Sequence, residues 1–196
     1  GGPVPCCRIE TADVPFDEPR HLLLAGGSNA SPTQLMRKFH GREETHPIVL
    51  LAVSVPDLIA VHSAHVTAYG AVAGTLMAWP GTSSRLTLLA VTGAQLRRIN
   101  ETESLGRNYH LAALPAGVVP TLPACGVLMY RSIRGVFAPN ATPLRLKAFN
   151  IAGGAPPAVS QQQALDAAAR ALDLQGPREA FVARLIEDAA FRQAAT

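Results

Sequence analysis

The chain has 196 residues, of which 48% are hydrophobic and 16% charged, proportions that predict one globular domain with a sizeable core and an appendage. Its 17 Lys and Arg residues against 14 Asp and Glu residues leave a formal net charge of +3. The sequence contains no basic run and few aromatic residues, which argues against nucleic acid as a partner. The longest apolar stretch, residues 48–55, is too short to cross a bilayer, so we expect no membrane partner.

The cysteines indicate the compartment. Cys6, Cys7 and Cys125 are odd in number and the first two are adjacent, which predicts neither a disulfide framework nor, without a C-x-x-C pair, a zinc site. The sequence does not begin with a basic segment followed by a sustained apolar one. We therefore expect free thiols in a reducing, cytoplasmic environment.

A buried strand is predicted at residues 20–25, after a proline-rich N-terminal arm at residues 1–19. The strand breaks at the tetrad Gly26-Gly27-Ser28-Asn29 and leads into a helix predicted at residues 31–40. A strand that breaks at paired glycines into a helix start lets backbone N–H groups converge on an anionic or carbonyl oxygen. The tetrad is therefore a candidate binding loop, with an ordinary turn as the alternative.

The middle of the chain predicts a sheet and one further helix. Apolar runs bounded by turn signals predict strands at residues 48–51, 58–61, 66–69, 85–91, 109–114 and 126–130. Pro56-Asp57 and Pro80-Gly81 are expected to separate neighbouring strands. Thr92 and Gln95 form a capping-box pattern, which predicts a helix that ends near residues 103–106.

The C-terminal part predicts helices. Residues 138–159 are rich in Pro, Gly and Ala and predict a linker or loop, and helices are predicted at residues 161–172 and 177–194. Their apolar stripes are narrow, so we expect them to pack on the sheet or on a second subunit, the latter giving a homodimer. The predicted fold class is α+β, with a mixed, partly barrel-like β-sheet and helices packed on it in residues 20–137, plus a C-terminal helical extension at residues 160–196.

Two motifs carry a resemblance to a known family. The first is the strand followed by Gly27-Ser28-Asn29, and the second is the strand and capped helix that run from Leu88 through Glu103 to a strand beginning at Tyr109. In this order and spacing they resemble the gamma-glutamylcyclotransferase-like family, over residues 20–131.

The motifs of this family also mark where the chain departs from it. Family members show Tyr-Gly-Ser-Asn in the first motif and roughly Leu-Asp-x-x-Glu-Gly in the second. Here Gly26 replaces the Tyr, Ile99-Asn100 stand where Leu-Asp would be, and Ser104 replaces the Gly. Glu103 aligns with the catalytic acid of the family, and Tyr109 keeps the aromatic residue that follows.

The resemblance implies an enzyme of the lyase or acyltransferase kind that cleaves a gamma-glutamyl amide, amine or analogue. In the family, the alpha-amine of the substrate attacks its own gamma-carbonyl, which releases 5-oxoproline and the free amine without a metal or an organic cofactor. Because ring closure is intramolecular, positioning alone supplies roughly 7–11 kcal/mol of the acceleration.

The resemblance also implies roles for individual residues. Glu103 takes the proton from the alpha-ammonium group of the substrate. The N–H groups of Gly27 to Asn29 bind the alpha-carboxylate or the developing oxyanion, and Tyr109 and Tyr130 orient the amide. The implied substrate-binding residues are Gly26, Gly27, Ser28, Asn29, Tyr109 and Tyr130.

Other interpretations of these residues stay open. Glu103 is also typical of a solvated helix end, and Gly26 and Ser104 depart from the family motif. A non-catalytic module that binds a small molecule or a partner protein on the same fold is therefore the alternative function. An enzyme with a related amide cleavage or acyl transfer is a third. Glu101 lies on another face of the same helix and is the natural control for Glu103.

A metal site is not predicted. His62 and His65 are the histidine pair closest to a metal-binding pattern, but an odd separation on a strand sends the two rings to opposite faces. Cys125 lies between apolar segments that are typical of a core, so we do not expect a nucleophile there.

Overall fold

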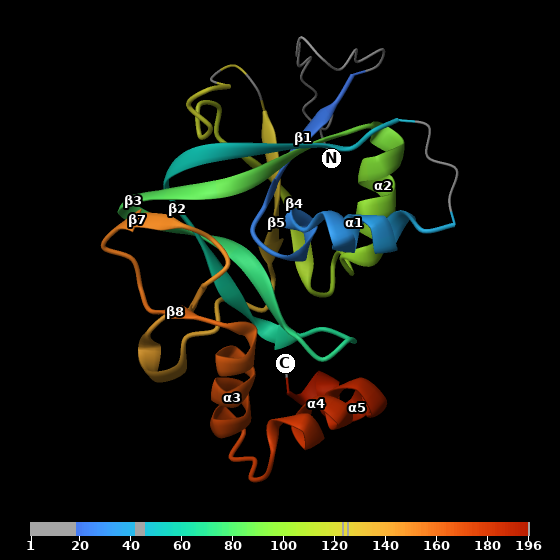
Figure 1. The fold of residues 1–196 in the computed structure, drawn as a ribbon, viewed down its shortest axis with the longest axis vertical. Helices are drawn as coiled ribbons and strands as arrows, with labels where there is room; N and C mark the ends of the chain where they lie inside the picture. The colour runs from blue at the N-terminus through green and yellow to red at the C-terminus, as the bar shows by residue number, and fades with distance from the viewer. Residues whose placement is uncertain (1–18, 42–45, 123, 125, 196) are drawn as a thin grey trace.

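The computed structural model describes residues 19–41, 46–122, 124 and 126–195. The predicted thiols, Cys6, Cys7 and Cys125, and nearly all of the predicted N-terminal arm lie outside these residues. The described chain has an α+β fold, as predicted, in which one mixed sheet carries helices against it (Figure 1). Among the described residues, no helix is both long and apolar enough to span a membrane.

Within the described part of the chain, the sheet is built from eight strands. They are β1 (His21–Ala25), β2 (Val49–Val66), β3 (Val72–Val91), β4 (Tyr109–Leu114), β5 (Val127–Ser132), β6 (Arg145–Leu146), β7 (Ile151–Gly153) and β8 (Ala158–Val159). Their order is β4-β5-β1-β3-β2-β6-β8, with β7 paired to β3. The pairs β1–β5 and β6–β8 are parallel and the others antiparallel, so the sheet is mixed, as predicted. In the described residues it does not close into a barrel.

The strands β2 and β3 form one long hairpin, and here two predicted breaks are wrong. Both strands continue through Pro56-Asp57 and Pro80-Gly81. The two sites lie opposite each other as an irregularity of the ladder, since the register jumps from Pro56–Ser83 to Leu58–Ala78. Asp57 and Gly81 both have positive φ, and the Asp57 carboxylate accepts a hydrogen bond of 2.7 Å from the Gly81 N–H. Turn-forming residues therefore bend this hairpin without ending its strands.

The tip of the hairpin also differs from the prediction. The strand expected at residues 66–69 is part of the turn, because β2 ends at Val66 and β3 begins at Val72. The Thr67 N–H closes the turn by donating to the Ala71 carbonyl at 2.8 Å.

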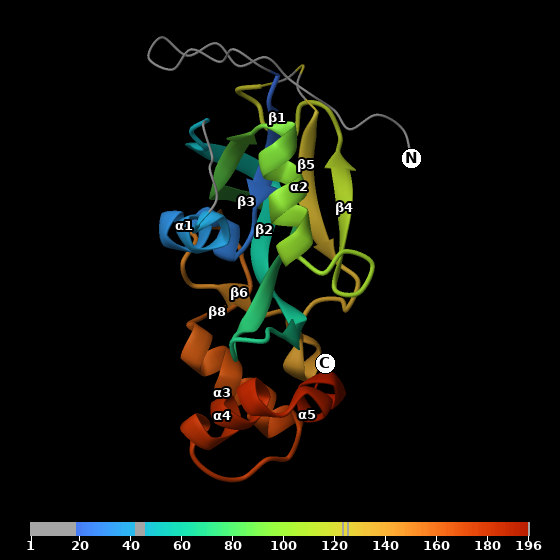
Figure 2. The same ribbon diagram turned by 90° about the vertical axis from the view of Figure 1, so that its right-hand side faces the viewer.

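Two helices cover one face of the sheet. They are α1 (Pro32–Phe39), which follows the short 3-10 helix η1 (Ser28–Ala30), and α2 (Gly93–Thr102). Figures 1 and 2 show them on the same side of the molecule. Buried Leu35 from α1 and Ile99 from α2 pack with Leu23 of β1, which stabilises both helices through apolar burial. The capping box predicted at Thr92 and Gln95 is present.

The segment at residues 138–159, for which the sequence predicts a linker or loop, contains the 3-10 helix η2 (Pro139–Ala141) and strands β6, β7 and β8. These strands have only two or three residues each, so they leave no alternating pattern for a prediction to detect. They bring this segment against the β2–β3 hairpin.

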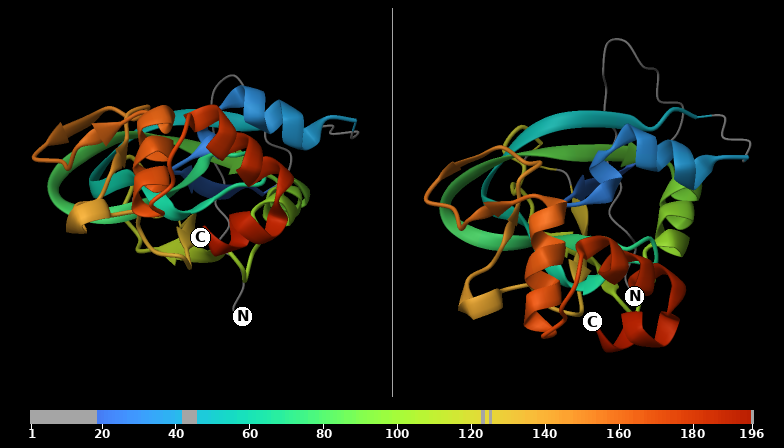
Figure 3. Two further views of the ribbon diagram at one scale, coloured as in Figure 1. Left: turned by 90° about the horizontal axis from the view of Figure 1, so that it is seen from below. Right: turned by 60° about the horizontal axis from the view of Figure 1, so that its bottom comes forward.

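The C-terminal helices gather at one end of the molecule (Figure 3). They are α3 (Gln161–Ala171), α4 (Arg178–Glu187) and α5 (Ala189–Ala194). The single helix predicted at residues 177–194 is wrong, because it breaks at Asp188, whose carboxylate caps α5 by accepting from the Phe191 N–H at 2.8 Å. Phe181 and Leu185 of α4 pack against Val66 and Val72 at the ends of the hairpin strands.

The close approach of Gly74 in β3 to the loop after β1 gives a testable prediction. A Cβ at position 74 would lie 2.6 Å from the Gly26 carbonyl oxygen and 3.1 Å from the Gly27 Cα, and backbone atoms cannot move aside cheaply. We expect Gly74→Ala to lower the free energy of unfolding by about 1–3 kcal/mol, as overpacking does. Urea denaturation measures this.

Gly93→Ala is the matched control for Gly74→Ala. A Cβ at position 93 meets nothing closer than 3.7 Å and the residue opens α2, so the control is expected to be as stable as the parent or slightly more so. Equal unfolding free energies for the two variants would contradict the close approach.

Candidate active site

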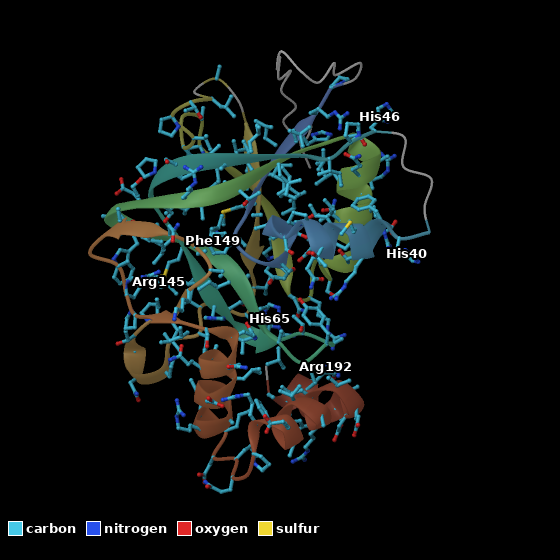
Figure 4. The ribbon with its side chains drawn as sticks, in the orientation of Figure 1. His40, His46, His65, Arg145, Phe149 and Arg192 are labelled. Atoms are coloured by element: carbon cyan, nitrogen blue, oxygen red, sulfur yellow. The ribbon has the colours of Figure 1, made fainter. Side chains whose placement is uncertain are left out.

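A cavity of about 980 Å³ lies where the loop after β1, the helix α1, the end of α2 and the hairpin tip meet. The segment around Phe149 and the strands β4 and β5 complete its wall. Figure 4 shows the side chains of this region, with His65 and Phe149 labelled. All the residues that the sequence predicts for the site, Glu103, Gly26, Gly27, Ser28, Asn29, Tyr109 and Tyr130, line this cavity.

Glu103 caps the C-terminus of α2 and turns its carboxylate toward the loop after β1. Its side chain is only 12% exposed. One carboxylate oxygen, Oε1, accepts a hydrogen bond of 3.1 Å from the Asn29 side-chain amide and lies 2.5 Å from the Lys38 ammonium. The helix ends here because Ser104 adopts a φ of +50°. That backbone conformation favours glycine, the residue which the family motif carries at this position.

The loop after β1 crosses the hairpin closely. A Cβ on Gly26 would lie 2.6 Å from the Leu76 side chain and 3.2 Å from the Thr75 backbone, so the space next to position 26 has no room for the tyrosine of the family motif. Within the described residues, the N–H groups of Ser28 and Asn29 have no hydrogen-bond acceptor, as expected for the first residues of a helical turn. Both residues line the cavity.

The two predicted tyrosines are buried, and each hydroxyl proton already has an acceptor. Tyr109 donates to the Gly74 carbonyl at 2.8 Å, and Tyr130 donates to the Asn100 side chain at 2.6 Å. Burial, and after it the nearby charge of Glu103, raises the pKa of both phenols well above the usual value. Both side chains are therefore neutral and offer a ligand an acceptor oxygen and an aromatic ring.

Lys38 belongs to the site and was missed by the sequence reasoning. Its ammonium group donates to the Asn29 side-chain oxygen at 2.7 Å and forms an ion pair with Glu103, and its side chain is only 13% exposed. The available signal was its position in α1, three residues after buried Leu35 and thus on the same helix face. Glu101, in contrast to Glu103, does not belong to the site. Its side chain is 58% exposed, forms an ion pair of 2.9 Å with Arg98 and does not line the cavity.

His65 is a second cavity residue that sequence reasoning considered only as a metal ligand. Its Nδ1 lies 2.8 Å from the Ser63 hydroxyl, and its ring meets the Tyr109 ring edge-on with centroids 5.2 Å apart. Burial, helped by the charge of Arg134, lowers the pKa of His65 to about 4, so the ring is neutral near pH 7. Among the described residues, no group of three or more His, Cys, Asp or Glu side chains is placed to hold a metal ion.

The lowered pKa of His65 predicts a pH dependence of stability. An unfolded chain takes up a proton at a pKa near 6.5 and the folded one only at about 4, so the folded state has its full stability above pH 6.5. As the pH falls from 6.5 to 4, His65 alone lowers the free energy of unfolding by about 3 kcal/mol. Urea denaturation at several pH values measures the loss.

The controls for this pH dependence are two glutamine variants. His65→Gln should flatten the fall in stability between pH 6.5 and 4, whereas His110→Gln, at an exposed position of β4, should leave it unchanged. An identical pH profile for His65→Gln and the parent protein would contradict the burial of a neutral ring.

Comparisons with known proteins gave matches among solved structures alone. No protein-family model matches the chain, and no curated protein matches it. A structure named gamma-glutamyl cyclotransferase is similar with a TM-score of 0.41 and 14% sequence identity, over 58% of this chain and 69% of that one.

Two further structures are similar. An uncharacterized protein from Homo sapiens has a TM-score of 0.47 and 13% identity, over 86% of this chain and 87% of that one. A protein from Arabidopsis thaliana, determined in solution, has a TM-score of 0.42 and 15% identity, over 58% of this chain and 69% of that one. These likenesses concern the fold.

Proposed function

We propose that this protein cleaves a gamma-glutamyl amide, amine or close analogue by intramolecular cyclisation to 5-oxoproline, with Glu103 as the general base. The main support is the placement of Glu103. Its carboxylate lies in a cavity, shielded from water, next to the Asn29 end of the loop after β1. A carboxylate beside unpaired backbone donors is what the proposed reaction needs, because it can take a proton on one side of a carbonyl that the donors polarise on the other.

The proposed reaction proceeds in two stages. Glu103 takes a proton from the alpha-ammonium group, and the freed nitrogen attacks the gamma-carbonyl carbon, which forms the new C–N bond of a five-membered ring. The original amide C–N bond then breaks as Glu103 returns its proton to the departing nitrogen. The ring nitrogen, which carries one surplus proton after its attack, gives that proton up to the departing amine as well, so the amine leaves as an ammonium ion and the ring nitrogen keeps one N–H. No other reactant is consumed, and the carboxylate ends the cycle as it began.

The loop and the tyrosines support the reacting groups. The N–H groups of Ser28 and Asn29 donate to the oxygen of the attacked carbonyl as it gains negative charge. Tyr109 and Tyr130 hold the gamma-glutamyl chain between their neutral rings and the loop. The alternative reactions, a related amide cleavage or acyl transfer, would use the same groups but would transfer the acyl group to a molecule other than the substrate's own alpha-amine.

A second candidate function is a non-catalytic module that binds a small molecule or a partner protein. The ion pair between Glu103 and Lys38 favours it, because a carboxylate that is already neutralised by an ammonium group 2.5 Å away is also typical of a structural role. Measured turnover separates the two functions.

The test of the proposed function is the release of 5-oxoproline by the purified protein from a panel of gamma-glutamyl amino acids and gamma-glutamyl amines. We expect Glu103→Gln to lower kcat by about 100-fold to 10,000-fold, the usual cost of losing a general base. Chromatography of the released 5-oxoproline measures the rate.

The matched control is Glu101→Gln, which removes an acid from the same helix but from its exposed face. It should keep the parent activity. A folded parent protein that releases no 5-oxoproline from any member of the panel would contradict the enzymatic function and leave the binding module.

A further inference from the structure

Lys38 is held in the cavity against the usual preference of its side chain. Lysine is among the residues that are least often buried, and fixing its long chain costs rotamer entropy. Here the ammonium group is turned inward and contacts Asn29 and Glu103, with 13% of the side chain exposed. A role for this charge inside the cavity would explain its position.

The ammonium group of Lys38 is not needed to hold α1 against α2. The Arg98 side chain of α2 already donates to the Lys38 carbonyl oxygen of α1 at 2.8 Å. Leu35 and Ile99 join the same helices through the apolar core. The side chain of Lys38 thus adds a charge to the cavity where backbone and core contacts already hold α1 in place.

The head of a gamma-glutamyl compound carries two opposite charges on one carbon atom. In the proposed function, its alpha-ammonium group goes to Glu103. The alpha-carboxylate on the same carbon must then lie within a few ångströms of Glu103, where Lys38 supplies the neighbouring positive charge. The two charged groups of the substrate and the side chains of Lys38 and Glu103 then form a square in which positive and negative charges alternate. Each charge has two neighbours of opposite sign, and repulsion acts only between the like charges at opposite corners.

We propose that Lys38 binds the alpha-carboxylate of the substrate, so that the Lys38–Glu103 pair is a receptor for an amino-acid head group. This inference rests on the proposed function and deepens it. Asn29 forms hydrogen bonds with both members of the pair and so holds the two charged groups next to each other. With the carboxylate held by Lys38, the N–H groups of Ser28 and Asn29 are left for the carbonyl oxygen, which decides between the two roles that the family resemblance implies for them.

The experiment compares two substrates that differ only in the carboxylate. One is a gamma-glutamyl amide, and the other is the 4-aminobutanoyl amide of the same amine, which cyclises to 2-pyrrolidinone. For the parent protein, kcat/KM should be about 30-fold lower with the 4-aminobutanoyl substrate, the scale of one charged hydrogen bond. Lys38→Met should lose a similar factor on the gamma-glutamyl substrate, mainly through KM, and should no longer distinguish the two substrates.

Arg97→Met is the matched control. It also removes one positive charge, from an exposed position of α2 outside the cavity lining, and should keep the parent preference. If Lys38→Met does not fold, Lys38→Gln, which retains hydrogen-bonding ability toward Asn29, replaces it. Calorimetry then compares the binding of 5-oxoproline with that of 2-pyrrolidinone, and we expect the preference for the carboxylate to be lost in Lys38→Gln.

The outcomes separate this inference from the function on which it rests. A parent protein that releases neither lactam overturns the proposed function, and the inference with it. An active parent protein combined with a Lys38 variant that loses the same factor on both substrates overturns the inference alone, because Lys38 then acts only through the placement of Glu103. Loss of the substrate preference in the Lys38 variant, with the preference kept in Arg97→Met, supports it.

Discussion

The site depends on the close contact between the loop after β1 and the hairpin strand β3. Gly26 and Gly27 lie against Gly74 so closely that side chains at positions 26 and 74 would overlap with their neighbours. This contact lets the loop turn over the hairpin and start η1, which places Asn29 in hydrogen-bonding distance of Glu103 from α2. Asn29 and Glu103, which are 74 residues apart in the chain, can therefore form a hydrogen bond because glycines let the loop pass close to β3.

Local signals predicted the fold best. The capping box at Thr92 involves residues within one turn of each other, so its pattern was sufficient to place the start of α2. The breaks predicted at Pro56-Asp57 and Pro80-Gly81 were wrong for a physical reason. A turn and an irregularity within a ladder use the same residue types, and only the pairing of β2 with β3 distinguishes them.

The candidate site was predictable only in part. The resemblance of two motifs to a known family brought Glu103 and the loop after β1 into one hypothesis, and both line the same cavity. Lys38 and His65 could not be recognised in this way, because their importance comes from which other segments they face after folding. Lys38 is an ordinary helix residue until α1 packs near the end of α2, and His65 is an ordinary strand residue until Tyr109 covers it.

The hairpin tip has a further consequence for the C-terminal helices. The turn contributes Thr67, Ala68, Tyr69 and Ala71 to the lining of the cavity. It also lies against α4, where a Cβ at Gly70 would lie 2.9 Å from the Val182 side chain. The turn therefore approaches α4 so closely that no methyl group would fit at position 70 without displacing a side chain of α4. The hairpin tip thus joins two parts of the molecule, because its turn borders the cavity while Val66 and Val72 beside it pack against the C-terminal helices.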